Sequence, residues 1–390
     1  MNTKKALPVL FAVMFLVMVG FGIIIPVLPF YAEKMGASPT ELGLLMAVYS
    51  LMQLLFAPMW GRISDRIGRK PVLMIGIFGL AISFFLMAIS SQLWMLFAAR
   101  IIGGLLSSAN MPTVMAYVAD ITSDEDRGKG MGIIGASVGL GFILGPAIGG
   151  IFSKTSLSMP FLIAGFSSLL TFILVMLILK ESLSPEHRGE RTTKRVPIRQ
   201  TLSGPISILY FLQLFISLSL AGLEATFAYF AAAKAGLGTI ELGYLFMIMG
   251  LAGAIVQGGL VGILTKKFGD GFVIQIGIVV SAIGFGLILL VDNFTTAAVF
   301  LTIFGIGNGV IRPSVSALLT KTSKTGYGST TGLLSSVDSL GRIIGPPLGG
   351  WLFSLAVGMP YISGMILSVI AFFLYQVYKS MSKKTEPASS

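Results

Sequence analysis

Five ionisable side chains lie inside long apolar stretches of the sequence, where a charge is costly. They are Arg100, Glu224, Arg312, Asp338 and Arg342. In the middle of a membrane each would cost roughly 2.5–3.5 kcal/mol, so each needs a partner, a water-filled cavity or a chemical task. We therefore take these five as candidate residues for moving a proton.

Glu224 is the first candidate for a group that binds and releases a proton. It lies in the segment AGLEATF at 221–227, with no basic residue three or four positions away. A carboxyl withdrawn from water holds a proton more readily, whereas water or a cationic substrate favours the ionised form. Competition between a proton and a cation for this carboxylate would suffice for exchange. The alternative is that Glu224 caps or pairs with a neighbouring helix in a structural role.

Asp338 and Arg342 are four positions apart, so on a helix they share one face and can pair. Two interpretations stay open. The pair is either a static ion pair within one helix, or Asp338 is a second protonation site. In the second case Arg312 would alternate between Asp338 and Glu224.

The elements that carry these residues are predicted to be membrane helices. The chain is 55% hydrophobic and 11% charged, against about 25% charged residues in a soluble domain. A spanning helix needs about 20 mostly apolar residues. Twelve stretches meet this length: 7–30, 41–60, 71–90, 94–118, 129–152, 159–180, 206–233, 241–264, 272–291, 296–320, 329–354 and 359–378. The sequence therefore predicts an all-α membrane protein with twelve transmembrane helices.

The distribution of positive charge predicts the orientation. With both termini on one side, the loops of the opposite side carry only three basic residues, Lys34, Lys154 and Lys234. Positive charge marks cytoplasmic loops, so we expect both termini in the cytoplasm. The net charge of +11 is then a topology signal, and we expect no nucleic-acid partner. The apolar run after MNTKK is too long for a signal peptide and lacks a cleavage site, which favours a retained first helix.

The two halves of the chain resemble each other at an offset of 200 residues. The segment TELG at 40–43 matches IELG at 240–243, and GPAIGG at 145–150 matches GPPLGG at 345–350. We expect two pseudo-symmetric six-helix bundles with a substrate site between them near the membrane midplane. The predicted divisions are bundles at 1–180 and 206–378, a cytoplasmic linker at 181–205 and a cytoplasmic tail at 379–390.

Several classes of function are disfavoured. There is no Cys, and His187 is the only His, which argues against a zinc or haem centre. The phosphate-binding pattern G-x-x-x-x-G-K-[ST] is absent, so ATP-driven export by this chain is disfavoured. The sequence shows no ring of charges, which disfavours an ion channel. It also shows no catalytic cluster, which disfavours a membrane enzyme. We expect no metal and no cofactor.

A basic loop joins the second and third predicted helices. It reads GRISDRIGRK at 61–70, where Asp65 can pair with Arg66 or Arg69 or cap the next helix. It resembles the signature of the major facilitator superfamily, in which it acts as a cytoplasmic latch; a basic loop obeying charge topology is the alternative. The second copy has Lys266 in place of the acid and is interpreted as degenerate. The predicted gating residues are Gly61, Asp65, Arg66, Gly68 and Arg69.

The fifth predicted helix carries GFILGPAIGG at 141–150. Glycines four apart let helices pack backbone to backbone, and a proline bends the helix. The segment resembles the motif of antiporters within this superfamily, although ordinary tight packing would also explain it. Its residues are Gly141, Gly145, Pro146, Gly149 and Gly150.

Two further segments resemble the twelve-helix drug:proton antiporters. These are GFGIIIPVLP at 20–29 and LFAARIIGG at 96–104. The chain is similar to Gram-positive multidrug exporters of the quinolone type and, in its first half, to tetracycline exporters. The resemblance implies a coupling role for Arg100, whose alternative is a snorkelling or packing role. The sequence departs from the pattern of these families at two positions. Val17 stands where tetracycline exporters have Asp, and Gly309 stands where multidrug relatives often have an acid.

The resemblance implies a proton-coupled antiporter that exports lipophilic or cationic drugs by alternating access. It would act as a monomer in a bacterial cell membrane, in contact with lipids, and be driven by the proton gradient. An exporter or importer of a specific metabolite or lipid with the same fold is the alternative. Met and Phe side chains can repack around varied substrates. The predicted pocket residues are Tyr49, Gln53, Met111, Phe142, Glu224, Phe227 and Asn308.

Overall fold

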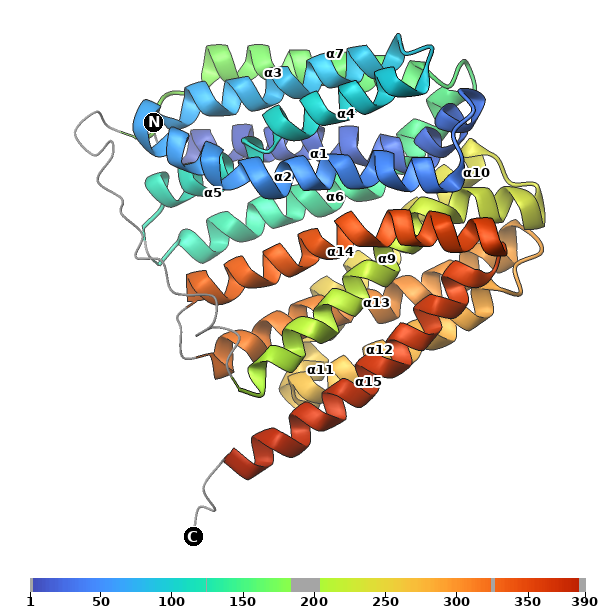
Figure 1. Ribbon diagram of the computed structural model, residues 1–390. Helices are drawn as coiled ribbons and strands as arrows, with labels where there is room; N and C mark the ends of the chain where they lie inside the picture. Colours follow the sequence, from blue (N-terminus) through green and yellow to red (C-terminus); the bar gives the residue numbers. More distant parts are fainter. Residues whose placement is uncertain (1–2, 124, 184–203, 324–326, 386–390) are drawn as a thin grey trace. The chain divides into compact units, whose positions relative to one another are not determined.

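The computed structural model describes residues 3–123, 125–183, 204–323 and 327–385 of the chain. In these ranges all regular elements are helices (Figure 1). They are α1 (Thr3–Lys34), α2 (Pro39–Ile67), α3 (Arg69–Ala88), α4 (Leu93–Ser107), α5 (Asn110–Ile121), α6 (Arg127–Ser153), α7 (Met159–Ile178), α9 (Ile206–Ala235), α10 (Thr239–Ile255), the π-helix η2 (Val256–Leu260), α11 (Val261–Phe268), α12 (Asp270–Ile288), α13 (Phe294–Thr322), α14 (Tyr327–Leu355) and α15 (Met359–Thr385).

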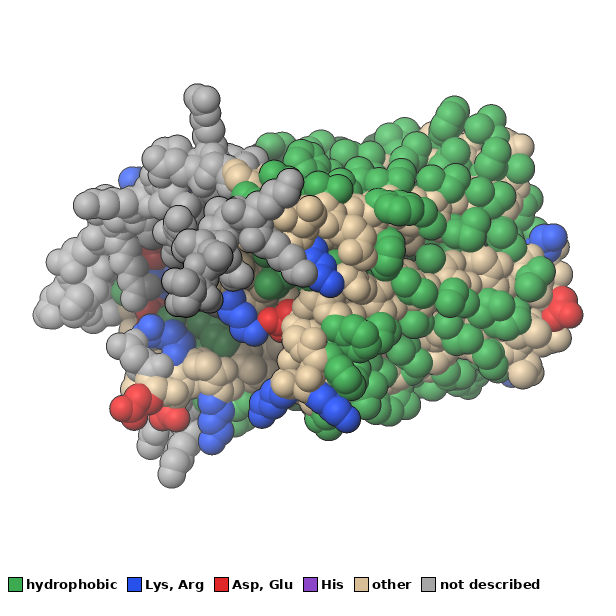
Figure 2. All heavy atoms as spheres, turned by 90° about the horizontal axis from the view of Figure 1, so that it is seen from below, with side chains coloured by type: hydrophobic (Ala, Val, Ile, Leu, Met, Phe, Trp, Pro, Cys, Tyr) green, Lys and Arg blue, Asp and Glu red, His purple; other side chains and the backbone are tan. Residues whose placement is uncertain are grey.

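The helices correspond to the twelve predicted stretches. Eleven spans in the described residues are long and apolar enough to cross a membrane, with α4–α5 and α10–η2–α11 each counted as one. The twelfth stretch is α14, whose mean hydropathy is lowered by Asp338, Arg342 and its Gly and Ser content. Figure 2 shows one face on which hydrophobic side chains cover most of the helix surface, while charged side chains gather near the ends. The all-helical fold class is confirmed.

Two of the spans are irregular. The fourth is interrupted between α4 and α5, one turn before Pro112, because a proline has no amide hydrogen for the carbonyl four residues earlier. The eighth contains the π-helix η2, which includes the two adjacent glycines Gly258 and Gly259. A π-turn of this kind is a local widening of an α-helix.

The chain forms two compact units, which are described separately. Unit 1 comprises Met1–Ser38, Val48–Thr193 and Gly238–Met247, and unit 2 comprises Pro39–Ala47, Lys194–Leu237 and Ile248–Ser390. The first turns of α2 thus belong to unit 2 and the rest of α2 to unit 1, whereas the first turns of α10 belong to unit 1 and the rest to unit 2. Most of the predicted linker at 181–205 lies outside the described residues, as does the end of the predicted tail.

In each unit one pair of helices packs almost backbone to backbone. In unit 1, a Cβ atom added to Gly22 of α1 would lie 2.9 Å from the Cα of Gly145 on α6. In unit 2, a Cβ atom added to Gly349 of α14 would lie 2.9 Å from the Cα of Gly222 on α9. Small residues therefore permit the α1–α6 and α9–α14 contacts, as the glycine spacing predicts.

Two further close approaches join segments that repeat in the sequence, and we call them the crosswise contacts. In unit 2, a Cβ atom added to Gly43 of α2 would lie 2.7 Å from the Cα of Pro347 on α14. In unit 1, a Cβ atom added to Gly243 of α10 would lie 3.1 Å from the Cα of Gly150 on α6. Each ELG segment therefore packs on the GP-x-x-GG helix of the opposite half of the sequence.

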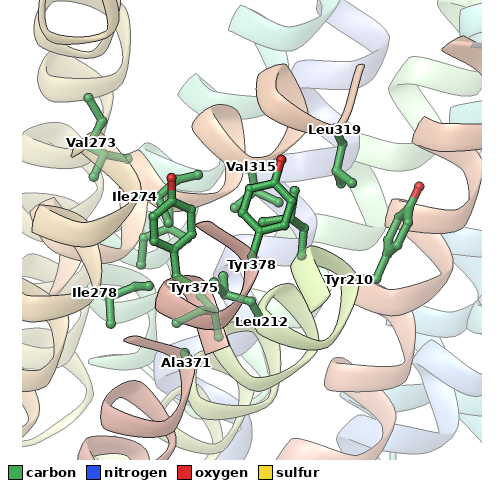
Figure 3. Packing of buried hydrophobic residues seen from close by; sticks show 14 of the residues in the cluster. Tyr210, Leu212, Val273, Ile274, Ile278, Val315, Leu319, Ala371, Tyr375 and Tyr378 are labelled. Carbon is green, nitrogen blue, oxygen red and sulfur yellow. The ribbon is translucent and has the colours of Figure 1, made fainter. Parts of the chain in front are cut away.

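A hydrophobic cluster holds one end of unit 2 together (Figure 3). It combines side chains of α9, α11, α12, α13, α14 and α15, among them Tyr210, Ile274, Val315 and Tyr375, all of them nearly or fully buried. Because these side chains come from six helices, the cluster holds together α9, α13 and α14, which carry the charged residues described next.

Candidate functional site

The charged residues predicted in the second half meet in unit 2, where α9, α13 and α14 contact one another (Figure 1). The Nε of Arg312 donates to Oδ2 of Asp338 at 2.7 Å. Oδ1 of Asp338 accepts from the Oγ of Ser217 at 2.6 Å and from the Nε2 of Gln213 at 2.8 Å. Asp338 is thus held by one charged and two neutral donors from two other helices.

Glu224 is held much more loosely than Asp338. Its Oε2 lies 3.7 Å from the Nη1 of Arg342, so the two form an ion pair across α9 and α14. The Glu224 side chain is 12% exposed, whereas that of Arg342 is 46% exposed. Glu224 is therefore paired with a neighbouring helix, as one of its two interpretations holds. Its role in binding a proton stays a prediction.

The prediction of an ion pair between Asp338 and Arg342 within α14 is wrong for this structure. Asp338 pairs with Arg312, and Arg342 pairs with Glu224. The reason is that each side chain finds its partner on another helix, and the donors of α9 and α13 already occupy both oxygens of Asp338. The pairing of Arg312 with Asp338 is one of its two predicted pairings.

A cavity of about 130 Å³ adjoins these charges within unit 2. Polar and charged side chains make up much of its wall. The lining residues are Gln213, Ile216, Ser217, Leu220, Ala221, Asn308, Arg312, Asp338 and Arg342. Such a cavity is large enough for a few water molecules, and these can carry a proton to Asp338, the carboxylate that lines it.

Two polar residues of the cavity wall were not predicted from the sequence. Gln213 and Ser217 hold Asp338, and both are nearly buried. A signal was present, since they are four positions apart on α9, and Glu224 follows seven residues after Ser217 on the same helical face. Polar residues in such a row along an apolar helix indicate a shared polar partner.

In unit 1, Arg100 lies over an aromatic ring. Its guanidinium carbon is 4.3 Å from the centre of the Tyr49 ring, and only 5% of the residue is exposed. This burial contradicts the snorkelling alternative, whereas a packing role and a coupling role both fit it. The Tyr49 hydroxyl is hydrogen-bonded to the Oγ of Ser107, and Gln53 donates to it at 3.4 Å.

The other predicted pocket residues differ in exposure. Met111 is exposed and Phe142 half-buried in unit 1, and Asn308 lines the cavity of unit 2. Phe227 is completely buried beside Phe230 and does not line that cavity. That the predicted residues other than Asn308 and Phe227 line one substrate pocket stays a prediction.

The predicted latch forms a buried ion network in unit 1. Arg69 is only 1% exposed, and its guanidinium lies 2.7 Å from Oδ1 of Asp65 and 3.0 Å from Oδ2 of Asp120. Asp65 thus pairs with Arg69, one of its predicted partners, whereas Arg66 is exposed. Gly61 has open space where its side chain would lie. Gly68 has a φ of 114° between α2 and α3, a conformation that favours glycine.

A carboxylate beyond the motif completes this network. The backbone amides of Arg69 and Lys70 donate to Glu181 at 2.8 and 3.1 Å. Glu181 therefore satisfies two free amides at the beginning of α3, where the helix dipole favours a negative charge. Neither Asp120 nor Glu181 was predicted, because each lies far from the motif in sequence.

Unit 2 contains one ion pair at the corresponding place, with its charges exchanged. At an offset of 201 residues, Asp270 corresponds to Arg69, Lys321 to Asp120 and Lys266 to Asp65. Lys321 lies 2.5 Å from Oδ2 of Asp270, which begins α12 as Arg69 begins α3. The second copy, interpreted as degenerate, thus keeps one ion pair in charge-inverted form.

No group of three or more His, Cys, Asp or Glu side chains in the described ranges could hold a metal ion. The site consists of charged, amide and hydroxyl groups. Their possible chemistry is the binding and release of protons and of polar substrate groups.

Comparisons with known proteins show which family this chain resembles. The model of the Major Facilitator Superfamily matches residues 10–274 and 258–390. The chain is 30% identical to multidrug resistance protein 2 of Bacillus subtilis (strain 168), covering 99% of this chain and 98% of that protein. It is 27% identical to the quinolone resistance protein NorA of Staphylococcus aureus (strain MRSA252), covering 98% of each.

Solved structures show the same fold. A bacterial homologue of the human lysosomal transporter Spinster, in an inward-facing and unoccupied conformation, has a TM-score of 0.81 at 16% identity, covering 100% of this chain and 99% of that one. The human organic anion transporter MFSD10 (TETRAN) has a TM-score of 0.70 at 23% identity, covering 96% and 100%. The chain therefore belongs to the Major Facilitator Superfamily and is a multi-pass membrane transporter rather than an enzyme.

Proposed function

We propose that this transporter is a proton-coupled antiporter that exports lipophilic or cationic drugs by alternating access. The observation that carries the proposal is the pair of carboxylates in unit 2, Glu224 and Asp338, each facing an arginine beside a cavity. Charged groups at membrane depth are rare and mark proton or substrate pathways. The multidrug resistance names of the relatives give independent support.

In this proposal, proton binding at Glu224 changes the pairing of Arg342. A proton that reaches Glu224 neutralises the carboxylate and weakens its attraction to Arg342, whose contact is already long at 3.7 Å. A cationic substrate near the ionised carboxylate favours loss of the proton. One carboxylate therefore serves proton and substrate in turn, which couples the inward flow of protons to export.

The proposal extends to orientation and surroundings. Both termini would lie in the cytoplasm, as the positive charge of the loops near the termini indicates. The protein would act as a monomer among the lipids of a bacterial cell membrane. Arg100, stacked on Tyr49 in unit 1, would contribute to coupling.

Efflux of ethidium tests the proposal. The protein is expressed in a bacterium that lacks its own drug pumps, and efflux is followed with and without a proton gradient. We expect efflux to stop when the gradient is dissipated and in the Glu224→Gln variant. The control is Glu33→Gln, which removes an exposed carboxylate at the end of α1 and should leave efflux unchanged.

Three outcomes would contradict the proposal. Efflux that continues without a gradient would exclude proton coupling, and full activity of Glu224→Gln would exclude this carboxylate as the proton carrier. If no dye or drug is exported by a folded protein, the alternative of a specific metabolite or lipid substrate would be favoured.

A further inference from the structure

The two oxygens of Asp338 face different kinds of partner. Oδ2 accepts from Arg312, a side chain that only donates hydrogen bonds. Oδ1 accepts from Ser217 and Gln213, whose hydroxyl and amide groups can both donate and accept. A proton on Oδ2 would therefore meet a donor, whereas a proton on Oδ1 has neighbours able to accept it.

Gln213 carries a spare acceptor next to this oxygen. The residue is 2% exposed, and its Oε1 has no hydrogen-bond partner among the described residues, although its Nε2 donates to Asp338. A buried polar atom without a partner costs about 1–3 kcal/mol. A half-turn of the amide would exchange its oxygen and nitrogen, and would direct Oε1 at Asp338 without moving the helix.

Ser217 can follow the same rearrangement. Its Oγ accepts from the Nε2 of Gln213 at 3.1 Å and donates to Oδ1 of Asp338 at 2.6 Å. When the amide has turned, the hydroxyl can donate to the amide oxygen instead. The three side chains thus form a small network that satisfies either state of the carboxyl.

Glu224 has no comparable surroundings. The partner recorded for it is Arg342, which donates only and lies 3.7 Å away. The charged groups near Asp338 are Arg312 of α13, Arg342 of its own helix and Glu224 of α9, and α15 has no charged residue from 359 to 378. Of the two carboxylates, Asp338 is therefore the one whose described partners include neutral groups that can accept a hydrogen bond from its protonated form.

We propose that Gln213 and Ser217 are positioning residues for proton exchange at Oδ1 of Asp338, with the amide of Gln213 turning over when the proton binds. The inference rests on the proposed function, which assigns a proton to Asp338. The proton comes from water in the cavity and forms a bond with Oδ1, while Arg312 stays at Oδ2. The O–H group then donates to Oε1 of Gln213, and release of the proton to the cavity restores the observed arrangement.

Infrared difference spectroscopy of the full-length protein reads this exchange directly. The amide carbonyl of glutamine is isotope-labelled, and spectra are taken on acidification. We expect a shift of one glutamine carbonyl band in the wild type that is absent in Asp338→Asn and in Gln213→Met. The protonated carboxyl of Asp338 should absorb at the lower frequency of a hydrogen-bonded acid, and Gln213→Met should raise that frequency.

Transport gives a second readout. Gln213→Met keeps the size of the side chain and removes both of its hydrogen-bonding atoms. We expect it to lower the maximal rate of proton-driven efflux about tenfold, equivalent to one buried hydrogen bond of about 1.4 kcal/mol. Substrate binding at fixed pH should change less than twofold, and Gln213→Asn should partly restore the rate. Gln275→Met, which changes a half-buried amide on α12, is the matched control.

The possible failures are distinguishable. Efflux insensitive to an uncoupler would overturn the proposed function, and this inference with it. Uncoupler-sensitive efflux that is lost in Asp338→Asn and normal in Gln213→Met, with an unchanged carboxyl band, would overturn this inference alone. If Gln213→Met does not fold, the wild-type spectrum decides, because an unshifted glutamine carbonyl band on protonation of Asp338 excludes a turning amide.

Discussion

At the scale of single residues, Arg69 is a cation enclosed between carboxylates. It is 1% exposed, and Asp65 and Asp120 both lie within 3.0 Å of its guanidinium. Removing one member of a buried ion pair leaves the other charge buried without compensation, which costs more than the pair itself contributes. Here two carboxylates would be left together.

We therefore expect Arg69→Gln to destabilise the protein by about 3–5 kcal/mol. Thermal unfolding of the purified protein, followed by the loss of its monodisperse fraction, measures the effect. Arg66→Gln is the control, because Arg66 is an exposed member of the same loop. Equal melting temperatures for the two variants would mean that the network around Arg69 contributes nothing to stability.

The limits of sequence reasoning are also visible at this scale. The motif at 61–70 was sufficient to name Arg69 as one of the possible partners of Asp65, because both residues belong to the same short segment. It was not sufficient to predict Asp120 or Glu181, which reach Arg69 and the beginning of α3 from distant parts of the chain. The neutral partners of Asp338, Gln213 and Ser217, were missed for the same reason, since these contacts depend on which face of α9 turns towards α14.

At the scale of elements, the two ion pairs at the beginnings of α3 and α12 have opposite polarity. Asp270 is 8% exposed and Lys321 is 67% exposed, so the more buried member is the acid in unit 2 and the base in unit 1. An acid in the first turn of α12 is also favoured by the helix dipole. The geometry of the pair is therefore shared, whereas the sign of the buried charge is not.

Charge exchange tests whether this pair fixes α12 to α13. Asp270→Lys places two positive charges together and should cost about 1–3 kcal/mol. The double variant Asp270→Lys with Lys321→Asp restores an attractive pair and should recover most of the loss in thermal stability. A double variant no better than the single one would show that position 270 requires an acid for another reason, such as the helix dipole.

Close helix contacts give a second prediction at this scale. A Cβ atom added to Gly345 of α14 would lie 3.0 Å from the Cβ of Ala221 and 3.2 Å from the amide nitrogen of Gly222. We expect Gly345→Ala to push α9 and α14 apart, which would lower both the melting temperature and the transport rate. The reason is that backbone atoms cannot yield as a flexible side chain does.

Gly332 provides the matched control on the same helix. No atom lies within 4 Å of a Cβ added there, and alanine is favoured over glycine in a helix by roughly 0.5–1 kcal/mol. Gly332→Ala should therefore leave the melting temperature unchanged or raise it. If both variants behave alike, helix propensity rather than the α9–α14 contact governs these positions.

At the scale of the whole molecule, the sequence was sufficient for the fold class. The twelve apolar stretches and the repeat at 200 residues predicted an all-helical transporter, because both signals are properties of the chain itself. The interruption at Ser108 and Ala109 was not predicted, although Pro112 was its local signal. The composition of the compact units could not be predicted either, because α2 and α10 divide between them.

The positive charge of the loops predicts how the whole chain is oriented in the membrane. Fusions of alkaline phosphatase, active only outside the cytoplasm, and of green fluorescent protein, fluorescent only inside, are made at chosen loops. We expect fluorescence at the C-terminus and phosphatase activity after Lys154, which follows α6. The physical reason is the retention of positive loops on the cytoplasmic side. Phosphatase activity at the C-terminus would contradict the orientation.

The crosswise contacts carry a consequence for ancestry. Each ELG segment packs on the GP-x-x-GG helix of the opposite half, so one contact is made twice with its two members exchanged. A contact repeated in this way has the form of an isologous interface, in which one self-complementary surface joins two copies. The sequence repeat and the exchanged contacts are what the fusion of two copies of a six-helix precursor with such an interface would produce. A harmful change in either motif would then find its compensating change in the other half of the chain.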